Sequence, residues 1–226
     1  MKKIILFAAI AVVPCSACAQ KAPQTETEKT LYYLGTAMTR NIKQFELSED
    51  ELKFVIMGFS DSLKNKEIKL DNSYNQKINE FFEKKRKERS AREKKDGEEF
   101  VRSFLKKNKK AKKLGSGLVF LLKKKGKGKK PVATDKVKVH YKGYFINGEE
   151  FDSSYKRNRP AEFPLNAVIP CWTEGLQRMK IGAKATLVCP SNIAYGEYGR
   201  PGAIPGGATL VFDVELLGIV KDEKKK

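Results

Sequence analysis

The 226-residue chain contains one tryptophan, one histidine and four cysteines, and these small numbers narrow the functions open to it. The single histidine, His140, shares one side of a predicted strand with Lys138 and Lys142. A side chain in that lysine-rich setting is a poor candidate for a catalytic base or a metal ligand. We expect neither a metal site nor a cofactor in this chain.

The apolar run near the N-terminus is too short to cross a bilayer. Ile4–Val13 form this run, two lysines precede it, and small residues follow in the string PCSACAQ, which is typical of an export signal. We expect residues 1–19 to be a signal peptide. It is either cleaved after Ala19 or processed as a lipoprotein signal, in which case Cys18 becomes the lipid-modified first residue. We favour lipidation and membrane attachment. Both routes place the mature chain in the periplasm or at the outer membrane of a bacterium.

The four cysteines fall into two pairs. Cys15 and Cys18 form a C-x-x-C string, but they lie inside the export signal, which argues against redox or metal chemistry there. Cys171 and Cys189 remain in the mature chain and either form a disulfide in an oxidising compartment or serve as two small buried side chains. We favour free thiols.

Basic residues are concentrated in one stretch. Residues 84–130 hold 21 lysines and arginines against 5 acidic residues, whereas the rest of the chain is nearly balanced. This stretch lacks aromatic residues at base-stacking spacing, and GKGKK at 126–130 lacks the spacing of a phosphate-binding loop. We therefore expect no specific nucleic acid partner. A solvated helix that attracts anionic lipid headgroups fits the composition better.

Three helices are predicted in the N-terminal half. Apolar residues recur at helical spacing over residues 31–45, and Ser48 with Glu51 forms a capping box that begins a second helix. A third helix begins at Asp71 or Asn72. Short helices cannot bury their apolar faces alone, so we predict that residues 20–83 form a dimerisation domain completed by a second copy. Packing of these helices on the C-terminal half is the alternative.

The third helix is predicted to continue as a basic linker helix over residues 84–113. From Lys84 to Glu99 it has almost no apolar residue, which is typical of a helix that bridges domains through solvent. A short apolar patch is predicted near its end, at Phe100, Val101, Phe104 and Leu105. Gly97 is a weak point within it, and Gly115 and Gly117 end it.

The C-terminal half changes to alternating apolar and polar residues, which predicts strands. A hairpin turn is predicted at Asn147-Gly148, and one short helix between Val168 and Lys180. The predicted strands are Val137–Tyr141, Ala185–Cys189 and Thr209–Val220. The fold class is therefore α+β, with an antiparallel sheet wrapped on a short helix.

Trp172 begins that helix and is expected to face aromatic residues from several strands, which is consistent with either a core or a pocket. Asp152 directly follows Phe151, and a carboxylate beside an apolar face needs a partner or a function. The string AYGEYGRPGAIPGGATL holds five glycines and two prolines, a composition typical of a functional loop.

From about Leu114 to Val220 the chain resembles the FK506-binding-protein (FKBP) type of peptidyl-prolyl isomerase, and we assign residues 114–226 to this domain. The resemblance is carried by three ordered strings, VHYKGYFINGEEFDSSYKRNRP, AVIPCWTEGLQRMKIGAKATLVCP and AYGEYGRPGAIPGGATLVFDVELL. The N-terminal string LYYLGTAMTRNIKQFELSEDELKFVIMGFSDSL is similar to the helical dimerisation domain of the two-domain bacterial members, the macrophage-infectivity-potentiator and periplasmic FKBP proteins.

The resemblance assigns roles to individual positions. It implies that Trp172 lies under the proline ring of the substrate, that Asp152 meets the twisting amide, and that Ile204 lies on a lid loop. The amide of Ile169 and the hydroxyl of Tyr195 would hold substrate carbonyls. The pocket walls would be Tyr141, Phe151, Phe163, Val168, Ile169 and Phe212. The sequence departs from the pattern at Ala161, Arg200 and Cys171, and the first two put the substrate preference in doubt.

The implied activity is cis/trans isomerisation of X-Pro bonds in exported proteins, which assists their folding. Proline-containing polypeptides would be the clients, and FK506-like macrolides would be inhibitors. A binding module that holds apolar, proline-bearing segments without turnover is the alternative.

Overall fold

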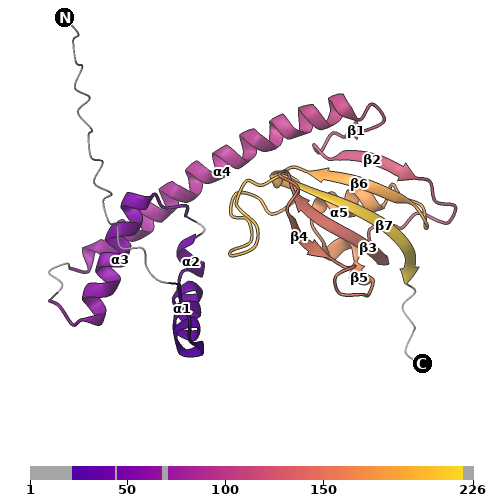
Figure 1. Ribbon diagram of the computed structural model, residues 1–226. Coiled ribbons are helices and arrows are strands. Elements are labelled where there is room, and N and C mark those ends of the chain that lie inside the picture. The colour runs from indigo at the N-terminus through magenta and orange to yellow at the C-terminus, as the bar shows by residue number, and fades with distance from the viewer. Residues whose placement is uncertain (1–21, 44, 68–70, 221–226) are drawn as a thin grey trace, which may run out of the picture. The chain divides into compact units, whose positions relative to one another are not determined.

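The computed structural model describes residues 22–43, 45–67 and 71–220 (Figure 1). The chain falls into two compact units, residues 1–39 and residues 40–226. The predicted signal peptide and Cys18 lie outside the described residues. Among the described helices, none combines the length and the apolar character that a bilayer span requires.

The first predicted helix is divided into two. α1 spans Glu26–Met38 and begins with a capping box in which the amide of Glu28 donates to Thr25 Oγ1 at 3.2 Å. The prediction of one helix reaching Phe45 is wrong, because α1 ends at Met38 with Thr39 as its cap, and a separate short helix, α2, covers Arg40–Lys43. The hydroxyl of Thr39 donates to the carbonyl of Thr36 at 2.8 Å, one of the local hydrogen bonds by which threonine competes with helix continuation.

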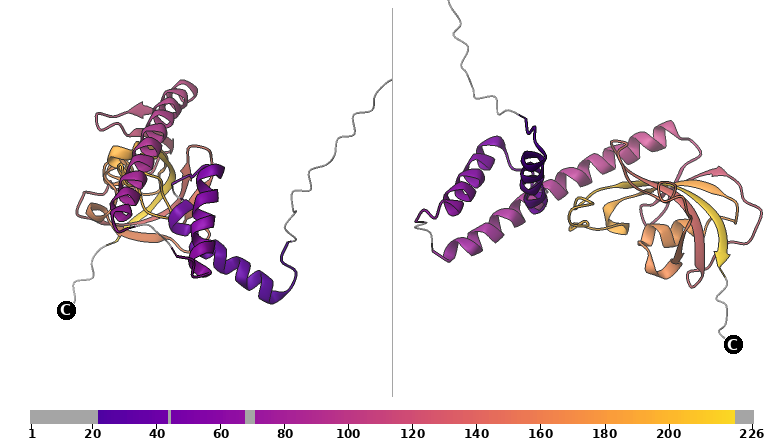
Figure 2. Two further views of the ribbon diagram at one scale, coloured as in Figure 1. Left: turned by 90° about the vertical axis from the view of Figure 1, so that its left-hand side faces the viewer. Right: turned by 60° about the horizontal axis from the view of Figure 1, so that its bottom comes forward.

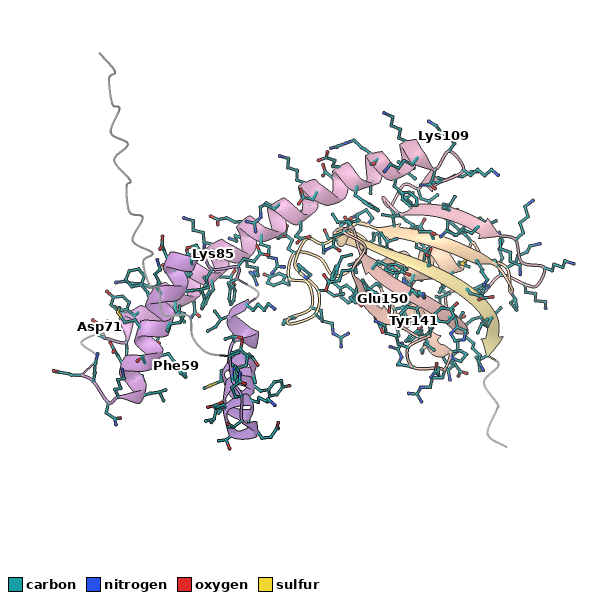
Figure 3. The ribbon with its side chains drawn as sticks, viewed as in Figure 1. Phe59, Asp71, Lys85, Lys109, Tyr141 and Glu150 are labelled. Carbon is teal, nitrogen blue, oxygen red and sulfur yellow. A yellow bond between two sulfur atoms is a disulfide. The ribbon has the colours of Figure 1, made fainter. Side chains whose placement is uncertain are left out.

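The second helix follows its prediction. α3 spans Glu49–Leu63, and Ser48 and Glu51 form the predicted capping box. No residue of α1 or of α3 is buried in the single chain. Phe59, labelled on α3 in Figure 3, is 49 % exposed. The apolar faces of these two helices therefore lack a covering surface within each unit.

The third helix runs without a break through the linker. α4 spans Ser73–Lys107, with Asn72 at the cap position, while the side chain of Asp71 accepts a hydrogen bond from the amide of Ser73 at 2.8 Å. The prediction that Gly115 and Gly117 end this helix is wrong. It ends at Lys107, with Asn108 at the cap position, where the amide and the side-chain nitrogen of Asn108 both donate to the carbonyl of Phe104 at 2.9 Å.

Between Lys84 and Glu99, α4 is not solvated on all sides, because Ser90 and Gly97 are buried, so the prediction of a polar rod there is wrong. Val101, in the predicted apolar patch, is buried as well. Val101 packs with Val119 and Val188 in a small apolar cluster on one face of the sheet. Because alternate residues of a strand point to opposite faces, this cluster and the main core lie on the two sides of the same sheet.

The C-terminal half is an antiparallel sheet with the order β1-β2-β6-β7-β3-β4, in which β5 also pairs with β3. Its strands are β1 Lys112–Lys113, β2 Val119–Lys124, β3 Lys136–Phe145, β4 Glu150–Ser153, β5 Ala161–Pro164, β6 Lys184–Cys189 and β7 Leu210–Val220. The α+β fold class is confirmed. β1, β2, β4 and β5 were not predicted as strands.

The sheet curves around one short helix, α5 (Pro170–Leu176), as Figure 1 and Figure 2 show. Two 3-10 turns, η1 (Leu165–Ala167) and η2 (Ser191–Ile193), complete this half. The predicted hairpin turn is confirmed. Gly148 adopts a φ of 90°, and the amide of Phe145 donates to the carbonyl of Glu149 at 2.9 Å.

A disulfide joins Cys171 of α5 to Cys189 of β6, so the prediction of free thiols is wrong. Both side chains are fully buried. The packing of α5 across the end of β6 brings their Cα atoms to 5.8 Å, a separation that a disulfide spans without backbone movement. This proximity depends on the tertiary fold, which residue spacing alone does not show.

Candidate functional site

Trp172 lies at the centre of an aromatic cluster built from three strands. Its indole is 4 % exposed. The rings of Tyr141 on β3, Phe163 on β5 and Phe212 on β7 meet it nearly at right angles, with centroid distances of 5.0, 5.8 and 5.3 Å. Edge-to-face packing of this kind stabilises each pair by about 0.5–1.5 kcal/mol beyond the area buried.

Phe151 on β4 extends the cluster. Its ring meets Phe212 edge-on at 5.7 Å and Phe145 at 5.0 Å. The two rings of Phe151 and Phe212 meet over Gly143 of β3, where a Cβ would lie 2.7 Å from Phe151 and 3.0 Å from Phe212. Gly143 is therefore required for the arrangement, and the sequence analysis did not identify it.

Two donors at the cluster have no acceptor among the described residues. The indole Nε1 of Trp172 is buried without a hydrogen-bond partner. The amide of the partly buried Ile169 also donates to none of the described residues, although its carbonyl accepts from the amides of Trp172 at 2.9 Å and Thr173 at 3.2 Å. A buried donor left unpaired destabilises the fold, so Trp172 Nε1 has a free place for an acceptor from water or from a ligand.

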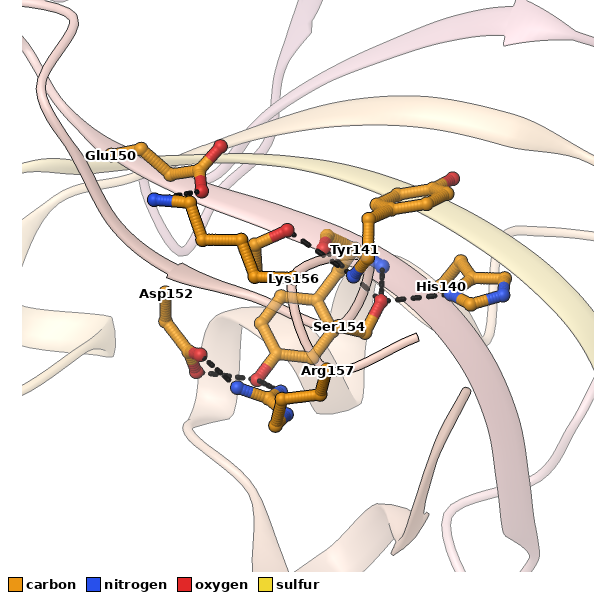
Figure 4. Close-up of polar contacts among 9 residues, drawn as sticks. His140, Tyr141, Glu150, Asp152, Ser154, Lys156 and Arg157 are labelled. Atoms are coloured by element: carbon orange, nitrogen blue, oxygen red, sulfur yellow. Dashed lines mark hydrogen bonds and ion pairs between the residues drawn. The ribbon is translucent and has the colours of Figure 1, made fainter. Parts of the chain in front are cut away.

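A polar triad of Tyr141, Asp152 and Arg157 adjoins the aromatic cluster (Figure 4). The hydroxyl of Tyr141 donates to one carboxylate oxygen of Asp152 and accepts from Arg157 Nη2 at 2.8 Å. Arg157 Nη1 donates to the other carboxylate oxygen. The three groups satisfy one another, and the orientation of the carboxylate is thereby fixed.

The contacts within the triad keep Asp152 and Tyr141 each in a single protonation state around neutral pH. Burial, followed by the hydrogen bond to Asp152, raises the pKa of Tyr141 to about 12. Burial alone would raise the pKa of Asp152, but the hydrogen bonds from Tyr141 and Arg157 and the charge of Arg157 together hold it below its usual 3.8. Asp152 is therefore a carboxylate and Tyr141 a neutral phenol.

Ser154 fixes the strand segment that carries the triad. Its fully buried hydroxyl accepts from the amide of Tyr141 at 2.8 Å and lies 2.9 Å from His140 Nδ1. The His140 ring also stacks on Tyr155, with centroids 4.5 Å apart. His140 thus contributes to the support of β3 and β4 and does not reach Trp172.

A loop between η2 and β7, residues 194–209, carries the two remaining candidates and is called the lid loop below. Tyr195 packs against the main core, which also contains Ile204, 6 % exposed. Arg200 and Ile204 exchange two backbone hydrogen bonds of 2.8 Å, and the amide of Gly207 donates to the carbonyl of Gly196 at 2.8 Å. The loop is thus an ordered hairpin.

The structure brings the predicted site residues to one core. Val168 and Ile169 lie partly buried at its edge, as does Ala161, whose methyl group fills less of the β5 side than an aromatic ring would. Arg157 was missed by the sequence analysis, although a basic residue five positions after Asp152, which follows Phe151, was an available indication. Within the described ranges, no group of three or more His, Cys, Asp and Glu side chains is placed to hold a metal ion.

Comparison with known proteins finds a matching family model for each half of the chain. The family model for FKBP-type peptidyl-prolyl cis-trans isomerase matches residues 127–217, and the model for the domain amino terminal to it matches residues 27–121. The FKBP-type isomerase FkpA of Aeromonas hydrophila is 42 % identical over 219 residues, which cover 89 % of this chain and 81 % of the relative. The isomerase Mip of Coxiella burnetii is 35 % identical over 230 residues, covering 98 % and 100 %.

A solved structure agrees with these sequence matches. The crystal structure of FkpA from Escherichia coli superposes with a TM-score of 0.65 at 36 % identity, covering 88 % of this chain and 98 % of that chain.

Proposed function

Because this chain belongs to the FKBP-type peptidyl-prolyl cis-trans isomerase family and accelerates rotation about X-Pro bonds, we propose that the Trp172 cluster is where the prolyl bond rotates. The single observation that carries this assignment is the set of three aromatic rings packed edge-on around a buried indole that lacks an acceptor. Proline-containing segments of folding polypeptides are the substrates.

The chemistry needs no covalent intermediate. Rotation about the amide breaks its resonance, with a barrier of about 18–20 kcal/mol, and the planar amide is more charge-separated than the twisted one. Aromatic surroundings with little water therefore disfavour the planar ground state relative to the twisted state. This is differential binding, and each ~1.4 kcal/mol gained corresponds to about a tenfold rate increase.

Individual residues have distinct roles in this proposal. Trp172 supports the proline ring from below, and Tyr141, Phe163 and Phe212 enclose it. Val168 and Phe151 border the flanking residues. The amide of Ile169 and the hydroxyl of Tyr195 donate to substrate carbonyls. Asp152, held by Tyr141 and Arg157, presents a fixed negative charge to the twisting amide.

A protease-coupled assay on a short X-Pro peptide tests the proposal. We expect the wild-type chain to isomerise the peptide well above the uncatalysed rate, and Asp152→Asn and Tyr195→Phe to lower kcat/KM by about tenfold or more. Lys142→Gln, on the outer side of β3, serves as a control and keeps wild-type activity. If the wild-type chain and both site variants share the uncatalysed rate, the cluster binds proline-bearing segments without turnover.

The N-terminal helices support a homodimer. α1 and α3 carry large apolar side chains that remain 39–70 % exposed in the single chain, including Leu31, Leu34, Val55, Phe59 and Leu63. Two copies that pair these faces remove them from water, which is the usual arrangement in a two-fold symmetric oligomer. Light scattering of the full chain is expected to give a mass of two protomers.

The N-terminal string supports export followed by attachment through a lipid on Cys18. A mass spectrum of the mature protein distinguishes acylated Cys18 from cleavage after Ala19. The aromatic cluster also has the chemistry to bind FK506-like macrolides. Competitive inhibition of the peptide assay by such a compound would support that assignment, and unchanged kinetics would contradict it.

A further inference from the structure

The linker helix α4 contacts the lid loop at a point where glycine is required on both sides. Gly97 of α4 faces Thr209, and a Cβ at position 97 would lie 2.1 Å from Thr209 Oγ1. Gly207 of the lid loop adopts a φ of 82°, and a Cβ there would lie 2.3 Å from the carbonyl oxygen of Ser90. The helix and the loop therefore approach each other at backbone distance.

A helix-destabilising residue in α4 has a structural reason here. An exposed glycine in a helix destabilises it by about 1 kcal/mol relative to alanine, and α4 has no other glycine. Ser90, two turns earlier, is 5 % exposed and also has a small side chain. Both positions lie where a larger side chain would push α4 away from the lid loop.

The outer end of the lid loop meets the same helix through side chains. The Arg86 guanidinium lies 4.0 Å from the centre of the Tyr198 ring, and Lys94 pairs with Glu197. The Lys94–Glu197 pair is largely exposed, so solvent screens it and its contribution is small. The Arg86–Tyr198 stack and the two glycine contacts are the stronger part of the contact.

Arg86, Ser90, Lys94 and Gly97 are spaced by four, four and three residues and therefore lie on one face of α4. The lid loop that they touch carries Tyr195 and Ile204, which pack in the core that contains Trp172. α4 passes beside this loop in Figure 1. A side chain on the linker helix thus acts on the substrate only through the loop.

We propose that Arg86, Ser90 and Gly97 of α4 are positioning residues that hold the lid loop in its substrate-binding conformation. The linker helix is then part of the isomerase site as well as a connection between the two halves. This inference rests on the proposed function of the Trp172 cluster. Since the lid loop contacts substrate in the ground state and the twisted state alike, loosening it raises KM and leaves kcat nearly unchanged.

Two variants of the full-length chain test the proposal, with hydrogen exchange of the lid loop as the first readout. Gly97→Ala forces the Thr209 side chain to move, and Arg86→Ala removes the stack on Tyr198. We expect amide exchange in residues 196–208 to accelerate about tenfold in Gly97→Ala and about threefold in Arg86→Ala. Exchange in β3 of the same samples is the internal reference, and it stays at the wild-type rate.

Matched substitutions outside the contact provide the controls. Gly58→Ala changes an exposed helical glycine that has nothing within 4 Å, and Lys84→Ala removes an exposed cation one residue before Lys85 on α4. Both controls keep the wild-type exchange in the lid loop. Replacing Thr209 by alanine in the Gly97→Ala background removes the nearest clashing atom and restores part of the protection.

The second readout is the kinetics of the peptide assay. A several-fold rise in KM with kcat unchanged, in both variants, supports the proposal. Unchanged lid exchange in both variants overturns it, and so does faster exchange with unchanged KM. A wild-type chain without isomerase activity overturns the proposed function instead, and hydrogen exchange still decides whether α4 holds the loop.

Discussion

Aromatic side chains are placed in opposite ways in the two halves of this chain. In the C-terminal half, Trp172 is 4 % exposed and three strands supply the rings that surround it. In α3, Phe54 and Phe59 are 71 % and 49 % exposed. A curved sheet can enclose an apolar residue from several directions, whereas a short helix covers one side only. The first half therefore needs a partner surface, and the second forms its own core.

The largest expected effect is the loss of the indole. Trp172→Ala is expected to lower the free energy of unfolding by about 3–5 kcal/mol, because it leaves a cavity among three rings. Trp172→Phe keeps part of the packing and loses less. Urea unfolding followed by circular dichroism measures both. Phe54→Ala in α3, measured in the Phe59→Asp background that is expected to be monomeric, is the control and changes stability by less than about 0.5 kcal/mol. Equal losses at the two positions would contradict the contrast between the halves.

Removal of the disulfide is expected to have the next largest effect. Cys171 and Cys189 are 18 residues apart, and closing a loop of this size stabilises the folded state by about 3 kcal/mol. Thermal unfolding of the wild-type chain should therefore shift downward in reductant. The double variant Cys171→Ala/Cys189→Ala should unfold at one temperature with and without reductant. An equal response of both proteins would show that the bond does not contribute.

A charge on the exposed apolar face of α3 is expected to have a smaller effect on stability per chain. Phe59→Asp places a charge on the face that the proposed dimer covers, which removes about 2 kcal/mol of burial per protomer. We expect sedimentation to show monomers at concentrations where the wild-type chain is dimeric, while the sheet half keeps its unfolding temperature. Lys53→Asp on the same helix is the charged control and leaves the mass unchanged. A dimeric Phe59→Asp chain would locate the interface elsewhere.

The pH dependence is the smallest predicted effect and concerns the triad. The folded pKa of Asp152 lies below its usual 3.8, so its contribution to stability is present above that value and is lost as the pH falls through the folded pKa. The pKa of Tyr141 is raised to about 12, so its phenol contributes to the stability of the fold at all lower pH values. That contribution is lost only as the pH rises from about 10 to about 12. Activity should therefore be flat from about pH 6 to 9. A change of activity with pH within that range would contradict the assigned protonation states of Asp152 and Tyr141.

Local features of the sequence predicted the elements whose causes are local. The capping box at Ser48, the turn at Gly148 and the alternation along β7 all depend on residues close in the chain, and each is confirmed. Tyr141 and Phe212 of the aromatic core lie on strands that alternation predicted, whereas Phe151 and Phe163 lie on β4 and β5, which it did not. Lys123 and Lys124 obscured β2, since the alternation ends in a basic run.

Features that depend on distant residues were not predictable in the same way. The disulfide requires that α5 crosses the end of β6, and the need for Gly97 arises from Thr209, more than a hundred residues later. Arg157 becomes a site residue only because the turn after β4 returns it to Asp152 and Tyr141. In each case tertiary packing supplies the partner residue, and the spacing of residues along the chain does not predict such a contact.

The bond between Cys171 and Cys189 has a consequence for where this catalyst matures. Such bonds persist in oxidising compartments and are reduced in a bacterial cytosol. Before oxidation, the helix that carries the indole is attached to β6 by packing alone. Under the export proposed above, the bond forms where other exported chains are oxidised, so a cell that fails to oxidise them would also weaken this isomerase.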